Sequence, residues 1–161
     1  MSSPVVLITG ALTGIGRAAA LTFAQEGARL VVAGRRDQEG QKLAAELQGL
    51  GAEAIFVHTD VRNENEVRNL VDQAIARFGH LDVAVNCAGT EGKPGPVTEQ
   101  TAETYAATFD TNVLGTLVWM NGSVGENQLQ GRHGVGRLAL LREPEIFLLA
   151  YRESDLDRVK G

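Results

Sequence analysis

The stretch Val5–Gly16 reads VVLITGALTGIG, and it decides the fold of this chain. Its first half, Val5–Ile8, is an apolar run typical of a short buried strand. The residues behind it, Arg17–Gln25, have a helical pattern. A strand must therefore turn sharply into a helix, and this turn contains three glycines, Gly10, Gly14 and Gly16.

Glycine suits such a turn because it accepts positive φ and lets the backbone approach another group closely. The helix that follows presents unpaired N–H groups and a partial positive charge at its start. A diphosphate is the natural occupant of such a place. We therefore expect a nucleotide here, with a tight turn that holds no ligand as the alternative.

Length and composition indicate one globular domain of 161 residues, 43% hydrophobic and 22% charged. The net charge of −5 argues against a general attraction to nucleic acid or to anionic membranes. No apolar run approaches the roughly 20 residues that span a bilayer. Met1–Pro4 has no basic region of a signal peptide, and Cys87 has no cysteine partner for a disulfide. We expect a cytoplasmic protein without nucleic-acid or membrane partners.

Further apolar runs alternate with amphipathic stretches, at Leu30–Ala33, Ala54–Val57 and Leu81–Val85. This order predicts the α/β class, with a Rossmann-type, doubly wound parallel sheet and helices on both faces. In the usual strand order the first and fourth strands are neighbours. The ends of these strands, Thr9 and Asn86, would then flank the ligand crevice.

Gly34-Arg35-Arg36 follows the second strand. An acidic residue near this position would bind a ribose 2′-hydroxyl, whereas a guanidinium suits a 2′-phosphate. The two arginines therefore favour NADP(H), with NAD(H) as the weaker alternative. Ordinary arginines of a solvated loop are the other interpretation.

Polar and small residues also follow the third and fourth strands. Asp60, with Val61 after it, can accept a hydrogen bond from an adenine amino group, or can mark the start of the next helix. Asn86 can tie its strand end to the neighbouring strand, and Ala88 and Gly89 leave room for a cofactor. Cys87 between them is expected to be a small buried filler rather than a reactive thiol.

With these motifs in order, the chain resembles the short-chain dehydrogenase/reductase family from Pro4 to about Leu117. Thr111-Asn112-Val113-Leu114-Gly115 resembles the family's next landmark. The resemblance implies hydride transfer between NADP(H) and a carbonyl or hydroxyl compound, with Asn112 holding a water in a proton relay. A helix N-cap is the alternative role for Asn112. By resemblance, the diphosphate is held by Gly10, Thr13, Gly14, Ile15 and Gly16.

The family's chemistry also requires a serine and a Tyr-x-x-x-Lys motif, in which the tyrosine transfers the proton. Tyr105 is followed four positions later by Phe109, and Tyr151 by Asp155. Catalysis is therefore in question, and a non-catalytic NADP(H)-binding module is an alternative. A truncated or frame-shifted product without activity is another. The histidines have no metal-ligand spacing, so no metal site is predicted.

The helical and strand patterns degrade after about Leu117. We expect residues 1–117 to form the cofactor-binding domain and the divergent tail, 118–161, to add a strand to the same sheet. Ile146–Tyr151 is predicted to pair beside Leu81–Val85. An uncovered edge there would invite self-association. The substrate, a small molecule, cannot be named from the sequence.

Overall fold

The computed structural model describes residues 3–124, 137–142 and 145–150. Its first part alternates strands and helices along the chain: β1 (Val5–Thr9), α1 (Gly14–Gln25), β2 (Arg29–Gly34), α2 (Asp37–Gly49), β3 (Ala54–His58), α3 (Glu64–Phe78) and β4 (Val83–Asn86). A long helical run and two strands follow: α4 (Ala102–Phe109), a π-helical turn (Asp110–Leu114), α5 (Gly115–Val124), β5 (Arg137–Arg142) and β6 (Glu145–Ala150).

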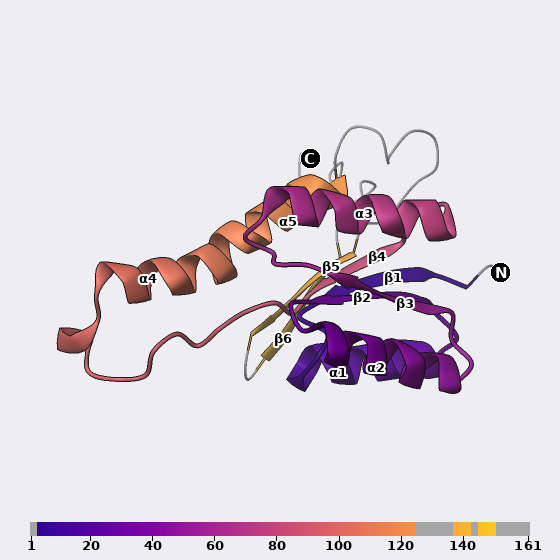
Figure 1. The fold of residues 1–161 in the computed structure, drawn as a ribbon, viewed down its shortest axis with the longest axis horizontal. Coiled ribbons are helices and arrows are strands. Elements are labelled where there is room, and N and C mark those ends of the chain that lie inside the picture. The colour runs from indigo at the N-terminus through magenta and orange to yellow at the C-terminus, as the bar shows by residue number, and fades with distance from the viewer. Residues whose placement is uncertain (1–2, 125–136, 143–144, 151–161) are drawn as a thin grey trace, which may run out of the picture.

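The strands form one sheet in the order β3-β2-β1-β4-β5-β6. The first five run parallel, and β6 is antiparallel to β5. Helices α1 and α2 cover one face, and α3 and α5 cover the other (Figure 1). Thr9 pairs in register with Asn86, so the ends of β1 and β4 lie side by side. The predicted Rossmann-type architecture is confirmed.

Both faces of the central strands are buried, as expected for a parallel sheet between two helical layers. Alternate side chains of β1 point to opposite faces, so Val6 and Ile8 join one core cluster, and Val5 and Leu7 join the other. The second cluster includes Trp119 of α5, which is fully buried against the α3 side of the sheet. The strand that leads into the glycine turn is thereby held in the core of the sheet.

The prediction for the tail was wrong in its pairing. The strand beside β4 is β5, with Ala84 opposite Leu138, and the run predicted for this place forms β6 on the far side of β5. The apolar runs of β5 and β6 both form strands, which their periodicity alone could not decide. Because β5 covers the edge of β4, the outermost strands of the described sheet are β3 and β6.

A second correction concerns the helix N-cap role that the sequence allowed for Asn112. The structure instead has a continuous run from α4 through the π-helical turn into α5, and Thr101 is the N-cap of α4. Asn112 is therefore not an N-cap. Among the helices of the described residues, none has the length and apolar character to cross a bilayer.

Candidate nucleotide-binding site

A groove of about 470 Å³ opens at the carboxyl ends of the first four strands. This volume lies within the range of small-molecule sites, roughly 300–1,000 Å³. Most of the residues predicted to bind a cofactor line it: Gly10, Thr13, Gly14, Ile15, Gly16, Arg35, Arg36, Asp60, Val61, Ala88 and Gly89. The structure thus brings together segments from the ends of four strands.

The glycine turn requires glycine for two separate reasons. Gly10 has φ of 64°, and a Cβ there would lie 2.5 Å from the carbonyl oxygen of Cys87. A Cβ on Gly16 would overlap the carbonyl oxygen of Gly10. Gly14 has φ of 52°, but a Cβ there would meet no heavy atom of the described residues within 4 Å. The turn is therefore compact on its inner side and open at Gly14.

The start of α1 is available to an anion. Thr13, its N-cap residue, has an extended backbone and makes no side-chain cap hydrogen bond, whereas Asn63 caps α3. The first N–H groups of a helix have no partner within that helix. Those of α1 therefore remain free of a side-chain cap at the groove, where a phosphate can accept from them.

Two arginines line the groove next to the end of β2. Arg36 is half exposed and lies 3.6 Å from Glu39, measured from Nη1 to Oε1. Arg35 lines the same groove and contributes to lowering the pKa of Asp60. Gly34 before them is confined, because a Cβ there would lie 2.7 Å from a methyl carbon of Leu12. The rim at this point therefore carries the positive charge of two arginines, directly after a glycine.

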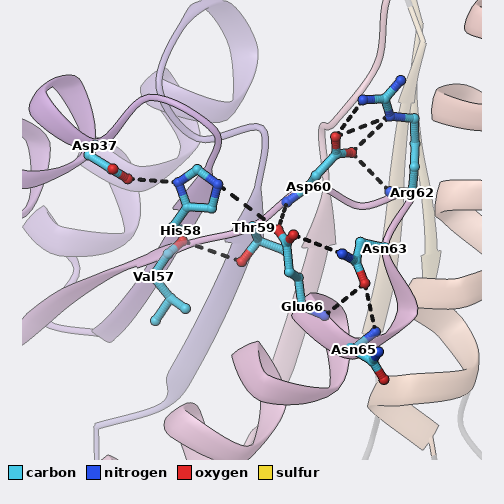
Figure 2. Close-up of polar contacts among 9 residues, drawn as sticks. All are labelled: Asp37, Val57, His58, Thr59, Asp60, Arg62, Asn63, Asn65 and Glu66. Carbon is cyan, nitrogen blue, oxygen red and sulfur yellow. Dashed lines mark hydrogen bonds and ion pairs between the residues drawn. The ribbon is translucent and has the colours of Figure 1, made fainter.

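Asp60 lies at the end of the groove beyond β3, and Arg62 fixes its carboxylate (Figure 2). Arg62 Nη2 donates to Oδ2 at 2.6 Å, and the Arg62 backbone N–H donates to Oδ1 at 3.1 Å. The side-chain hydrogen bond from Arg62 is the largest cause of the lowered pKa of Asp60. Asn63 caps α3 three residues later, so Asp60 also precedes the start of a helix, and its contact with an adenine stays a prediction. Val61 beside Asp60 packs against Gly115.

Asn86 lies beneath the groove rather than along it. Thr9 Oγ1 donates to Asn86 Oδ1 at 2.7 Å, and Asn86 Nδ2 donates to Thr116 Oγ1 at 3.0 Å. Thr9 and Asn86 are both buried. Asn86 therefore ties β1 to β4 and to α5, the role its position after the fourth strand suggested. Thr116 carried no recognisable signal in the sequence.

Asn112 closes the loop that follows β4. Its Oδ1 accepts from the Thr90 N–H at 2.8 Å, and its Nδ2 donates to the Thr90 carbonyl at 2.8 Å. Its own carbonyl accepts from Thr116 Oγ1 at 2.8 Å. Asn112 belongs to the π-helical turn, a feature frequent at functional sites. Its proposed role in holding a water stays a prediction.

Some groove residues were missed by the sequence analysis as ligand contacts: Leu12, Thr59, Cys87 and Glu91. Thr59 and Cys87 each follow a strand directly, so the rule that parallel sheets bind ligands beyond their carboxyl ends could have found them. Burial raises the pKa of the Cys87 thiol to about 11, which agrees with a small filler rather than a thiolate.

Comparison with known proteins places the chain in a family. The family model described as short chain dehydrogenase matches residues 4–135. The rabbit (Oryctolagus cuniculus) L-fucose dehydrogenase is 38% identical over 112 residues, which cover 70% of this chain and 38% of that protein. An uncharacterized oxidoreductase of Staphylococcus haemolyticus is 34% identical over 146 residues, which cover 91% of this chain and 62% of that protein.

Solved structures agree with this match. A variant of the actinorhodin polyketide ketoreductase, crystallised with NADPH, superimposes with a TM-score of 0.73 and 33% identity, covering 76% of this chain and 47% of that chain. The chain thus spans 38% and 62% of the two relatives and about half of this solved structure. By sequence and by architecture, the chain belongs to the short-chain dehydrogenase/reductase family of oxidoreductases, with the family's NAD(P)-binding Rossmann fold.

Proposed function

We propose that this chain binds NADP(H) in the groove at the ends of β1 to β4. The diphosphate lies on the glycine turn and the start of α1, and the adenine lies beside Asp60 and Val61. The 2′-phosphate lies against Arg35 and Arg36. The observation that carries the proposal is that one cavity of about 470 Å³ brings the glycine turn and both arginines together.

The charges around the end of β2 favour the phosphorylated cofactor. A 2′-phosphate is strongly anionic, and each hydrogen bond from a guanidinium is worth roughly 1.5–3 kcal/mol. Selection of an unphosphorylated ribose would require a carboxylate in the groove near the end of β2. Gly34, Arg35 and Arg36 occupy that place, and all three line the groove. This arrangement supports NADP(H) over NAD(H).

The reaction class we propose is hydride transfer between the nicotinamide and a carbonyl or hydroxyl carbon of a small molecule. The bound cofactor supplies the hydride chemistry. The chain supplies position: Ala88 and Gly89 line the groove beside β4, and Asn112 holds the following loop through Thr90. The substrate itself is left open.

A second function, a non-catalytic NADP(H)-binding module, is favoured by a specific observation. No tyrosine of the 161 residues is followed four positions later by lysine. Such a lysine would lie on the same helical face as the tyrosine and lower its pKa. A module without this pair would bind the cofactor and show no turnover.

Fluorescence titration with NADPH and with NADH tests the binding proposal. The Arg35→Ala/Arg36→Ala variant is expected to weaken the binding of NADPH by about 10- to 100-fold and the binding of NADH much less. Arg68→Ala is the matched control, because Arg68 lies on α3, is exposed and does not line the groove. Equal losses for the two cofactors would refute the 2′-phosphate assignment.

A turnover assay over simple ketones and sugars then separates the two candidates. Oxidation of NADPH that depends on a carbonyl compound identifies an enzyme, and tight binding without turnover identifies a module. Absence of binding, together with a melting transition of low cooperativity, would point to a product without activity.

Location and assembly are also proposed. A net charge of −5 and a single cysteine suit a cytoplasmic protein. Self-association through a sheet edge is the assembly we propose, now at β3 or β6 rather than at β4. Sedimentation equilibrium tests it, because self-association makes the apparent mass rise with concentration.

A further inference from the structure

We propose that His58 is a positioning residue that sets the preference for the 2′-phosphorylated cofactor by holding the Asp37 carboxylate away from the two rim arginines. The inference rests on the proposed function, because it concerns the same end of the groove. It assigns a role to a hydrogen-bonded pair outside the groove lining, His58 and Asp37. Neither His58 nor Asp37 is among the residues that line the cavity.

The sheet register brings His58 next to the arginines. His58 is the last residue of β3, and its Cα pairs with that of Gly34, the residue directly before Arg35 and Arg36. Its ring therefore lies on the strand adjacent to the proposed phosphate site. Figure 2 shows the imidazole between the carboxylates of Asp37 and Glu66.

The ring engages Asp37 directly. His58 Nδ1 lies 2.7 Å from Asp37 Oδ1. An ionised carboxylate can only accept a hydrogen bond, so Nδ1 carries the proton and the imidazole is the donor. This holds for the neutral ring as well as for the charged one. The tether therefore does not require a protonated histidine.

The second carboxylate near the ring is already occupied. Glu66 Oε2 lies 4.0 Å from His58 Nε2, beyond hydrogen-bond distance. It accepts from the Asp60 N–H at 2.7 Å, and Glu66 Oε1 accepts from Asn63 Nδ2 at 2.9 Å. Of the charged groups that face the ring from α2 and α3, Asp37 is the one His58 holds.

The position of Asp37 next to Arg36 explains why its carboxylate needs a partner. Asp37 is the first residue of α2, where an acidic side chain stabilises the helix dipole, and it directly follows Arg36. Its side chain is 69% exposed, so it would turn freely without a partner. A free carboxylate could pair with the rim arginines or repel the phosphate. The bond to His58 directs it toward the end of β3 instead.

The test compares dissociation constants for NADPH and NADH in wild type, His58→Ala, His58→Asn, Asp37→Asn and His58→Ala/Asp37→Asn. We expect His58→Ala to reduce the preference for NADPH by about 3- to 10-fold, with NADH binding unchanged. His58→Asn, whose amide can donate to Asp37, should retain most of the preference. The double variant should recover it, because the charge that His58 restrains is gone.

The outcomes separate this inference from the proposed function. A wild-type preference that His58→Ala leaves intact, or a loss that Asp37→Asn does not reverse, overturns the inference alone. A wild type that binds both cofactors equally, or neither, overturns the proposed function and the inference with it. If His58→Ala weakens the binding of both cofactors equally, the hydrogen bond between His58 and Asp37 is purely structural, and this result would also refute the inference.

Discussion

Substitution of Gly10 by alanine is the sharpest test of how the glycine turn is built. The new Cβ would lie 2.5 Å from the Cys87 carbonyl oxygen and 2.6 Å from the Ala88 nitrogen. Both atoms belong to the backbone directly after β4, where the Cys87 N–H donates to the Thr9 carbonyl, so they cannot rotate away as a side chain could. The residue would also retain φ of 64°, which L side chains adopt at a cost.

The magnitude follows from these two effects. The left-handed backbone costs an alanine about 1–2 kcal/mol. Forcing the extra methyl against fixed backbone adds about 1–3 kcal/mol. Gly10→Ala should therefore destabilise the protein by about 2–5 kcal/mol, a large share of the roughly 5–15 kcal/mol that holds a domain folded.

Two neighbouring glycines separate the effects. Gly14→Ala meets only backbone strain, because a Cβ there has open space among the described residues. Gly16→Ala meets only the clash with the Gly10 carbonyl, partly offset by the better helix propensity of alanine. Each should destabilise the protein less than Gly10→Ala does.

Urea unfolding followed by Trp119 fluorescence measures the series. Trp119 is the single tryptophan of the chain and is fully buried in the native core, so its emission reports global unfolding. The expected result is a lower midpoint for Gly10→Ala at an unchanged m-value. A Gly10→Ala protein as stable as Gly14→Ala would refute the reasoning, since it would mean that the contact with the end of β4 yields readily.

Other changes test the polar contacts around the groove. Asn86→Ala should lower the free energy of unfolding by about 1–3 kcal/mol in the same urea assay, because it leaves the buried Thr9 hydroxyl without its acceptor; an effect within error would show that the tie is dispensable. The folded-state pKa of Asp60 is lowered, so its contribution to stability is complete above the ordinary carboxylate pKa of about 3.9 and is lost as pH falls through the folded value. Arg62→Ala should shrink this acid-dependent loss in urea midpoints measured from pH 6 to pH 2.5, and an identical pH profile would contradict the assignment. Because burial raises the pKa of Cys87 to about 11, its thiol should react with a disulfide reagent at pH 8 far more slowly than free cysteine does, and rapid labelling of the folded protein would contradict this burial.

The sequence determined the first four strands because their signals are local and mutually consistent. Buried parallel strands read as unbroken apolar runs, and Val5–Ile8 needed only one more residue to match β1. Once the strands alternated with helices, right-handed crossovers left few arrangements, and the predicted neighbours β1 and β4 followed. The groove residues could be predicted from the sequence for the same reason, because the segments that contain them follow the ends of strands.

The contacts between distant segments could not be predicted from the sequence in this way. A run such as that of β5 or β6 does not state which strand it will join, since the partner is chosen by the space the rest of the fold leaves. The hydrogen bond that Asn86 donates to Thr116 and the bonds between Asn112 and Thr90 also join residues more than 20 positions apart. An N-cap role was expected for Asn112 because asparagine is common there, but its side chain instead bonds to the backbone of Thr90 in a loop.

The distribution of the groove residues along the chain separates two halves of the family's site. Every groove-lining residue that the structure describes falls between Thr9 and Glu91. Later residues support the groove from outside its lining: Trp119 packs in the core, and Thr116 accepts a hydrogen bond from Asn86. Proton transfer in the family depends on residues that come after this region. The cofactor binding that we propose therefore depends on residues between Thr9 and Glu91, whereas the family's proton transfer depends on a Tyr-x-x-x-Lys motif that the 161 residues do not contain, so binding and turnover call for separate experiments.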